Sequence, residues 1–147
     1  MLDTNIKYPN FSDVVNIVQT NLENDSRVGT TFFALSLEED YSIDINYPAA
    51  YIHPSDITYT GQTLQYELIV EVMDIAQQQD SLKHVFSNTS QILIDLLSKL
   101  YRDQDNLSFS FIQEDQILEA VEADYQDRVS GYRLSLILEV KAANRIC

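Results

Sequence analysis

The chain has 147 residues, and 45% of them are hydrophobic, so it is long and apolar enough to form one globular domain with a continuous core. Its formal net charge of −14 argues against a general phosphate-binding surface, because affinity for nucleic acid comes largely from Lys and Arg. No apolar run is long enough to cross a bilayer, and the first residues lack the basic and apolar regions of a signal peptide, so we expect a soluble protein made in the cytoplasm.

The chain is predicted to begin with an arm and a helix. Residues 1–10 are expected to be extended. Apolar residues then recur at helical spacing over 11–22, with Asn10 or Ser12 as the N-cap. The polar triplet 24–26 is predicted to end this helix.

Two β-prone segments follow the first helix. Residues 30–37 are rich in β-branched and aromatic side chains, which predicts a strand. The stretch 41–51 is rich in Tyr and Asp and contains a proline, so we expect a loop with one or two short strands. Because the residue before a proline is pushed to extended geometry, residues 51–54 are predicted to end a strand.

The centre of the chain predicts a strand followed by a helix. Every second residue over 64–72 is apolar, which is the period of a half-buried strand. After a turn at 77–80, apolar residues lie three or four positions apart over 82–101, as on one stripe of a helix. Asp80 and Ser81 are the predicted N-caps of this helix. The two apolar surfaces are expected to pack against each other.

Three further β segments are predicted in the last third of the chain. A turn at 103–106 precedes a strand over 107–111, where large apolar residues alternate with Ser. The segment 116–125 fits either a short helix or a strand, and the shared parity of its apolar residues favours the strand. The last strand, 132–140, alternates apolar and polar residues, which is typical of an antiparallel sheet with one wet face. Residues 142–147 are expected to form a C-terminal tail.

These elements together predict an α+β fold, in which an antiparallel or mixed β-sheet carries two α-helices on one face. The whole chain, 1–147, is expected to be a single domain, because it contains no internal repeat and no low-complexity linker. On the other face of the sheet, the strands mix charged with large apolar side chains. Such a mixture suits ordinary solvent-facing strands, and it also suits a specific protein interface. The residues concerned are Gln65, Glu67, Ile69, Glu71 and Met73, and Arg133, Ser135, Ile137, Glu139 and Lys141.

Residue types that carry chemistry form no recognisable catalytic motif in this sequence. His53 and His84 lie far apart, and a structural role is favoured for the second because it falls in the central helix. Cys147 cannot form an internal disulfide. The stretch 103–108 lacks the glycine and the third oxygen ligand of a calcium loop, and the carboxylates of 38–44 are typical of a solvated loop. We therefore expect no enzyme activity, no metal site and no cofactor.

Five short blocks of the sequence occur in a characteristic order, and they span Tyr47 to Pro54, Tyr66 to Asp74, Ser87 to Leu100, Asp127 to Tyr132 and Asn144 to Cys147. In these blocks the chain resembles neck-ring and tail-terminator-like structural proteins of tailed bacteriophages that infect Bacteroidetes, including the crAss-like group. The resemblance covers most of the chain after residue 46. The chain departs from the pattern at Ala49, Ala50, Asn88 and Tyr132.

The resemblance implies a virion structural protein that forms a homo-oligomeric ring, six- or twelve-fold, in the head–tail connector. Its partners would be copies of itself and adjacent neck, portal or tail proteins, with no membrane involved. The protein would be made in the host cytoplasm and located in the neck or tail of the virion. DNA would pass through the ring without specific binding, because carboxylates facing the channel would repel its phosphates over a range of ~8 Å.

The predicted subunit interface combines a loop, one sheet face and a turn. The loop before the central strand has the aromatic content typical of contact hot spots, and a loop folded over its own core explains that content equally well. A polar turn enters the last strand, where Gly131 allows either a bulge or the close approach of another chain. The candidate interface residues are Tyr41, Tyr47, Tyr51, Glu67, Glu71, Asp127, Arg128 and Arg133.

Two other classes of function remain alternatives. High negative charge favours an acidic intracellular binding module, such as an inhibitor that mimics DNA. Against it, the carboxylates are spread along the chain and alternate with apolar residues in the strands. A small enzyme would need a concave pocket with convergent polar groups and a strongly shifted titratable residue, and the sequence offers no candidate for either.

Overall fold

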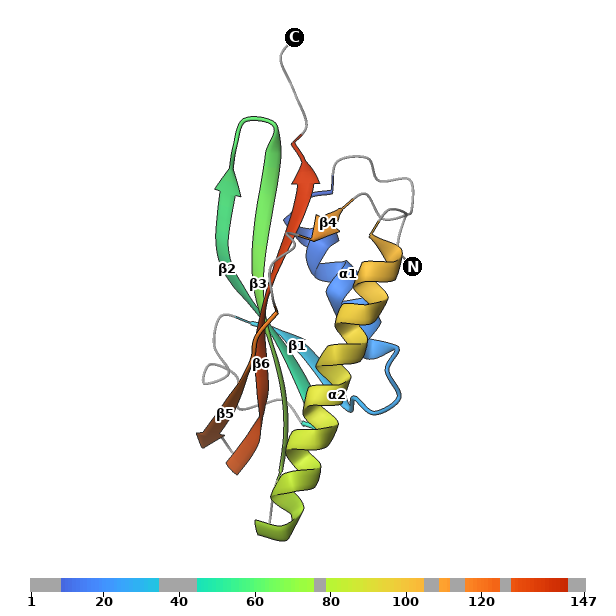
Figure 1. The fold of residues 1–147 in the computed structure, drawn as a ribbon, viewed down its shortest axis with the longest axis vertical. Coiled ribbons are helices and arrows are strands. Elements are labelled where there is room, and N and C mark those ends of the chain that lie inside the picture. The colour runs from blue at the N-terminus through green and yellow to red at the C-terminus, as the bar shows by residue number, and fades with distance from the viewer. Residues whose placement is uncertain are drawn as a thin grey trace.

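The described fold consists of two α-helices and a six-stranded sheet (Figure 1). The structure is a computed structural model that describes residues 9–34, 45–75, 79–104, 109–111, 116–124 and 128–142. In chain order the elements are α1 (Phe11–Glu23), β1 (Thr30–Phe33), β2 (Ala49–Tyr59), β3 (Thr63–Ile75), α2 (Gln79–Asp103), β4 (Ser110–Phe111), β5 (Leu118–Asp124) and β6 (Arg128–Lys141).

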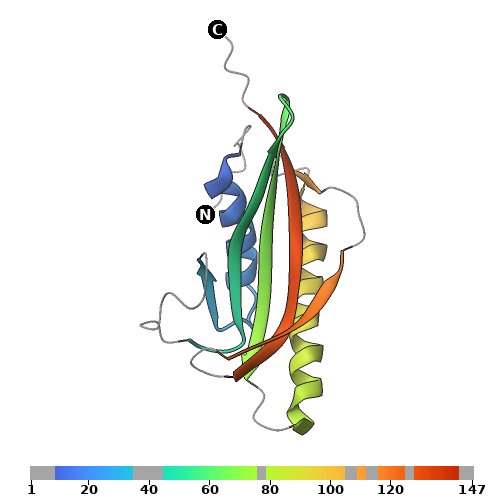
Figure 2. The ribbon, with the colours of Figure 1, turned by 90° about the vertical axis from the view of Figure 1, so that its left-hand side faces the viewer.

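The sheet is mixed and is organised around two long strands. Its order is β1-β2-β3-β6-β4, and β5 also pairs with β6. β1 runs parallel to β2, whereas the other pairs are antiparallel. The register of β3 and β6 is unbroken from Thr63 opposite Lys141 to Ile75 opposite Val129. These two strands therefore form the axis of the sheet, which faces the viewer in Figure 2.

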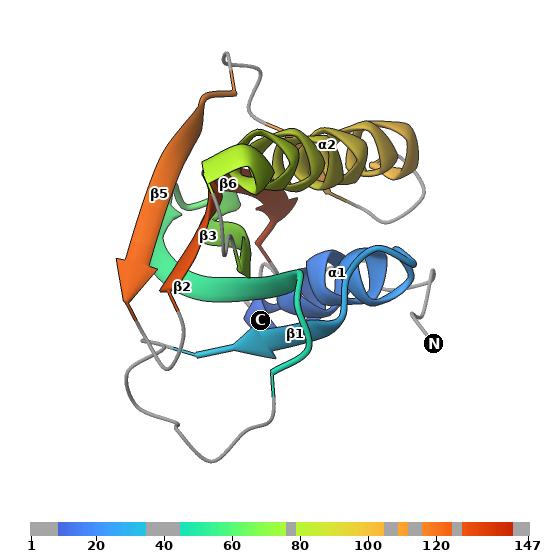
Figure 3. The same cartoon turned by 90° about the horizontal axis from the view of Figure 1, so that it is seen from below.

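Both helices pack on one face of the sheet, which curves around them (Figure 3). The main core fills the space between these layers, and its cross-strand pairs include Leu68 opposite Leu136 and Val70 opposite Leu134. Each such side chain stabilises the fold by roughly 1.5–3 kcal/mol when it leaves water. The predicted α+β fold, with a mixed sheet and two helices on one face, is confirmed.

The predicted first helix is confirmed together with its N-cap. The side chain of Asn10 accepts a hydrogen bond from the Asp13 backbone N–H at 2.9 Å, and the Asp13 carboxylate accepts one from the Asn10 N–H at 2.8 Å. This reciprocal pair satisfies two backbone donors at the start of the helix. Ser12, the alternative cap, lies inside α1. The predicted arm lies outside the described residues except for Pro9 and Asn10.

The prediction that a strand ends at Pro54 is wrong, because β2 continues to Tyr59. The backbone oxygen of Ile52 faces β1, since it accepts a hydrogen bond from the Ala34 N–H at 3.1 Å. The backbone nitrogen of Pro54, two residues further along β2, faces the same side of the strand. The pairing of β2 with β1 ends at Ile52, so this nitrogen faces no strand that the structure describes. A proline is therefore tolerated there, and the register shift after it adds one residue to β2.

The central helix begins earlier than its predicted caps. α2 starts at Gln79, so Asp80 and Ser81 lie in its first turn and do not cap it. The predicted apolar stripe is confirmed, since Leu93 and Leu100 are fully buried. Within the described ranges, neither helix is long and apolar enough to span a membrane.

The predicted C-terminal strands are present with altered bounds. Of the segment 107–111, only Ser110 and Phe111 form a strand, β4, and 107–108 lie outside the described residues. Within the segment 116–125, Leu118–Asp124 form a strand, β5, as the parity of the apolar residues favoured, and residue 125 lies outside the described residues. The last strand starts earlier than predicted, at Arg128. The predicted tail is described only at Ala142.

Gly131 lies at a point of close backbone approach within the subunit. The register of β6 against both β3 and β5 runs through it without a shift, so the predicted bulge is absent from this stretch. A Cβ atom added to Gly131 would collide with the carbonyl oxygen of Val72 and would lie 2.9 Å from the Cα of Met73. Of the two possibilities that Gly131 allows, a close backbone approach is the one present, and the approaching strand is β3 of the same chain.

Candidate interaction surface

The sheet face opposite the helices presents a mixture of polar and apolar side chains. Alternate residues of β3 and β6 enter the core, so the residues between them point to this side. Neighbouring residues of β2 and β5 extend the surface on either side. We call it the outer sheet face and define it by His53, Ser55, Gln65, Glu67, Ile69, Glu71, Glu119, Arg133, Ser135, Ile137, Glu139 and Lys141.

A row of ionisable side chains crosses four strands on the outer sheet face. Arg133 Nη2 donates to Glu119 Oε2 at 2.9 Å, and Arg133 Nη1 lies 4.0 Å from Glu71 Oε1. His53 Nε2 lies 3.8 Å from the same oxygen of Glu71. His53 Nδ1 donates to the Ala34 carbonyl oxygen at 2.7 Å, which leaves Nε2 directed at the carboxylate. Glu71 is only 9% exposed, so its neighbours have to stabilise its charge.

Apolar side chains lie beside this row. Ile69 is opposite Ser135, and Ile137 is on the same face one pair further along β6. Both isoleucines are partly exposed. Beyond them, Gln65 Nε2 donates to Glu139 Oε2 at 3.1 Å. The outer sheet face therefore carries two isoleucines at its centre, with Glu67 opposite Ile137 and further carboxylates at both ends, a mixture of apolar and charged groups that is found in specific protein interfaces.

Two of the predicted interface tyrosines belong to a small second core at one end of this face. Tyr51 is 1% exposed and packs with Met73 and Val129. Its ring stacks on that of Phe32, with ring centroids 5.4 Å apart. Tyr47 packs against the same cluster. Tyr47 and Tyr51 therefore pack within the subunit, as in the alternative in which the loop folds over its own core.

The remaining predicted interface residues are distributed unevenly. Arg128 is the first residue of β6, opposite Asp124 at the end of β5. Tyr41 and Asp127 lie outside the described residues. Ser55 Oγ donates to Glu67 Oε1 at 3.2 Å, which fixes that carboxylate. Three of the predicted residues lie together on the outer sheet face, and they are Glu67, Glu71 and Arg133.

A second exposed surface lies on the outward side of α2. Ile94 is 45% exposed near its middle. Ser98 Oγ donates to the Ile94 carbonyl oxygen at 3.0 Å, so this hydroxyl turns back to the helix. The two aspartates of α2 with described side chains, Asp95 and Asp103, are only half-exposed. We call this surface the α2 face and define it by the exposed side chains of the helix, which are Lys83, His84, Ser87, Gln91, Ile94, Ser98, Tyr101 and Arg102.

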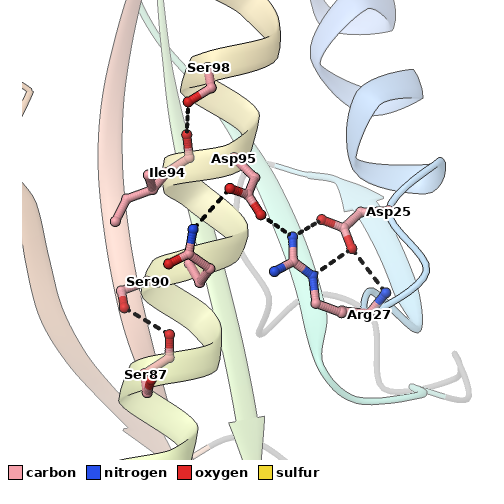
Figure 4. A network of polar contacts seen from close by, with 8 residues as sticks. Asp25, Arg27, Ser87, Ser90, Ile94, Asp95 and Ser98 are labelled. Carbon is pink, nitrogen blue, oxygen red and sulfur yellow. Dashed lines mark hydrogen bonds and ion pairs between the residues drawn. The ribbon is translucent and has the colours of Figure 1, made fainter.

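Arg27 connects the segment after α1 to the middle of α2 (Figure 4). Its Nη2 donates to Asp25 Oδ2 and to Asp95 Oδ2, at 2.6 Å in each case, and its Nε donates to Asp25 Oδ1 at 2.9 Å. Gln91 Nε2 donates to the other oxygen of Asp95 at 2.9 Å. The hydrogen bonds with Arg27 lower the pKa of both Asp25 and Asp95 and raise the pKa of Arg27. Ile94 points to the other side of the helix (Figure 4).

An open cavity of about 590 Å³ adjoins this network, between α2 and the end of β3. Its wall includes Arg27, Asp74, His84 and Asn88. Burial raises the pKa of Asp74, whose carboxylate accepts the Ile75 backbone N–H at 2.8 Å. In the part of the chain that the structure describes, no three metal-ligating side chains gather at one point. The cavity thus offers isolated polar groups, and its chemistry does not identify a ligand.

Sequence reasoning missed the α2 face and the Arg27 network. The available signal for the network was an isolated basic residue, since Arg27 is the only Lys or Arg between residues 8 and 82. Comparisons with protein-family models and with curated protein sequences found no match to the chain. A function for these surfaces therefore has to be proposed from their geometry and from the sequence resemblance.

Proposed function

We propose that this chain is a subunit of a homo-oligomeric ring in the head–tail connector of a tailed bacteriophage. In that ring it would adapt the portal to the tail and leave a channel for DNA. The subunit would act through its shape and surfaces, without a reaction, a metal or a cofactor of its own. The proposal rests on the resemblance of the sequence blocks and on the nature of the exposed surfaces.

The outer sheet face is the observation that carries the proposal. The helices cover one face of the sheet, whereas the middle of the other face presents Ile69 and Ile137 within a ring of charged groups. Apolar side chains that are surrounded by ordered charges support a contact in a defined register. Glu71, Glu119 and Arg133 are held by contacts within the subunit, so little ordering is needed when a partner docks.

A closed ring requires two different contact surfaces on each subunit. Contacts of this kind are heterologous, because a surface on one copy meets a different surface on the next. The outer sheet face and the α2 face meet this requirement, since they lie on opposite sides of the helix-on-sheet structure (Figure 3). A subunit with these two surfaces supports assembly around an axis.

The charge of the subunit suits passage of DNA. Every copy carries a formal net charge of −14, and a ring multiplies that charge around the channel. Phosphates that come within the Debye length of ~8 Å would be repelled. DNA would therefore pass through without the Lys and Arg contacts that retain it on nucleic-acid-binding proteins.

Two measurements test the ring proposal. Mass spectrometry of purified virions of the phage that encodes the chain should detect it as a structural component. Light scattering should find the isolated subunit soluble and largely monomeric, and a larger assembly should form when portal complexes are added. The absence of the chain from virions, or a stable dimer that ignores the portal, would contradict the proposal.

The alternative is an acidic intracellular module that mimics DNA, which the net charge of −14 favours. The side chains of the outer sheet face fit a DNA mimic less well. Glu119 is bound to Arg133, Glu139 is bound to Gln65, and Ile137 lies between them, so this surface lacks a continuous row of free carboxylates. A DNA mimic would be found in infected cells and not in purified virions, so the mass spectrometry experiment separates the two functions.

A further inference from the structure

The two exposed surfaces of the subunit differ in their charge. On the α2 face, the charged residues are Lys83 and Arg102, and Arg102 Nε donates to Oδ1 of the half-exposed Asp103 at 3.0 Å. No exposed side chain described in α2 is a carboxylate. On the outer sheet face, Arg133 is bound to a glutamate and Lys141 lies at the end of β6. The carboxylates of the outer sheet face are Glu67, Glu71, Glu119 and Glu139.

Charge limits how copies of this chain can touch. Two subunits with a net charge of −14 each repel one another, and juxtaposed like charges oppose association. A contact between two outer sheet faces would bring glutamates against glutamates. A contact between two α2 faces would bring cations against cations. The pairing that places opposite charges together is the α2 face of one copy against the outer sheet face of another.

We infer that neighbouring copies in the ring dock in this manner, with the α2 face of one subunit on the outer sheet face of the next. The occupant of each surface is thus a second copy of this chain. The inference rests on the proposed ring and names the surfaces that build it. Each copy uses both surfaces, so the contact is heterologous and can repeat around an axis.

The apolar residues and the spacing of the charges are compatible with this docking. Ile94 of one copy is placed over Ile69 and Ile137 of the next, so that each of these exposed or partly exposed side chains loses contact with water. Lys83 and Arg102 lie about 28 Å apart along the helix, on either side of Ile94. The carboxylates of the outer sheet face span about 20 Å along β6, from the level of Arg133 to Glu139, and long basic side chains bridge the difference.

Disulfide trapping tests the inference directly. Two full-length chains are prepared, both with Cys147→Ser, one with Ile94→Cys and the other with Ser135→Cys. They are mixed in equal amounts at high concentration and oxidised, and the products are measured by mass spectrometry. Docking of unlike surfaces predicts a mixed disulfide fraction above the half that random pairing gives. A random ratio, or an excess of disulfides between two copies of the Ile94→Cys chain, would overturn the inference.

A charge variant tests the electrostatic basis of the contact. Lys83→Gln with Arg102→Gln, added to the Ile94→Cys chain, should slow formation of the mixed disulfide about tenfold. The control is Ser12→Glu with Asn16→Glu, which changes the net charge equally on exposed residues of α1. Slowing by both variants to the same extent would indicate general repulsion and would overturn the inference. Raising the salt from about 0.05 M to about 0.5 M should reduce the difference in rate between the charge variant and its control, because it screens the local attraction, whereas a difference that salt leaves unchanged would contradict that attraction.

Failure of the docking inference is distinguishable from failure of the proposed function. If the chain is present in the virion neck and the mixed disulfide is not enriched, the ring proposal stands and the docking is wrong. If the mixed disulfide is enriched and the chain is absent from virions, the docking stands and the proposed function is wrong.

Discussion

Arg27 Nη2 lies 2.6 Å from Asp95 Oδ2, and this contact joins the segment after α1 to the centre of α2. Arg27→Leu should lower the free energy of unfolding at neutral pH by about 1–3 kcal/mol, because it leaves the carboxylate of Asp25 buried without its cation. Denaturant unfolding measures the change. The control is Arg102→Leu, whose exposed ion pair with Asp103 should contribute little. Equal effects of the two substitutions would contradict the structural role of Arg27.

The same network makes stability depend on acid pH. Arg27 lowers the pKa of Asp25 and Asp95, so both ionised carboxylates are stabilised more in the folded than in the unfolded state. This contribution is present above the ordinary pKa of 3.8 and is lost as the pH falls through the lowered values. Below about pH 4, the free energy of unfolding of the Arg27→Leu variant should therefore fall less steeply with decreasing pH than that of the parent chain. Parallel curves of unfolding free energy against pH would contradict this expectation.

Asp74 should have the opposite effect on stability. Burial raises its pKa, so its charge destabilises the folded state at neutral pH, and this cost disappears as the pH falls through the raised value. Asp74→Asn keeps an acceptor for the Ile75 N–H and removes the charge. It should raise the free energy of unfolding at neutral pH. A loss of stability in the same unfolding assay would show that the carboxylate has a favourable partner.

Gly131 should tolerate no side chain. In Gly131→Ala the new Cβ meets the backbone of Val72 and Met73, which cannot move without breaking the pairing of β3 and β6. We expect a loss of about 3 kcal/mol or more, or failure to fold. The control is Gly61→Ala, where the space is open and the φ of +92° makes the cost about 1 kcal/mol. Thermal unfolding that ranks Gly61→Ala as the more damaging change would contradict the close approach.

Ile94 should matter for assembly more than for folding. It is 45% exposed, so Ile94→Asp should change the melting temperature of the monomer only slightly. The same substitution should abolish assembly, because it puts a carboxylate against the acidic outer sheet face of the neighbour. Ile57→Asp is the matched control, since Ile57 is 53% exposed and pairs with the buried Tyr66, which places it on the side of the sheet opposite the outer sheet face. Sedimentation in the presence of portal complexes measures assembly, and equal behaviour of the two variants would count against the α2 face.

The periodicity of hydrophobic residues along the sequence was sufficient to predict most of the described fold. Alternation placed Leu68 and Leu136 on the buried side of their strands, and helical spacing placed Leu93 in the core. The end predicted at Pro54 failed because the rule for prolines describes the preceding residue and does not reveal that the N side of this proline faces an unpaired edge.

The candidate surfaces were predictable only in part. Parity along single strands was enough to place Glu71 and Arg133 on one face, and the structure adds the partner His53 from a third strand. The burial of Tyr51 could not be foreseen, because aromatic residues in a loop-like segment suit a contact and a local core equally. The α2 face was not predicted because its defining property is that none of its described exposed side chains is a carboxylate, which depends on which side of α2 is buried.

Electron cryomicroscopy of the virion neck tests the central claim most directly. A reconstruction should show copies of this subunit closed around the DNA channel, between portal and tail, with α2 of each copy against the outer sheet face of the next. A neck whose rings are all built from other polypeptides, with no density for this fold, would contradict the account.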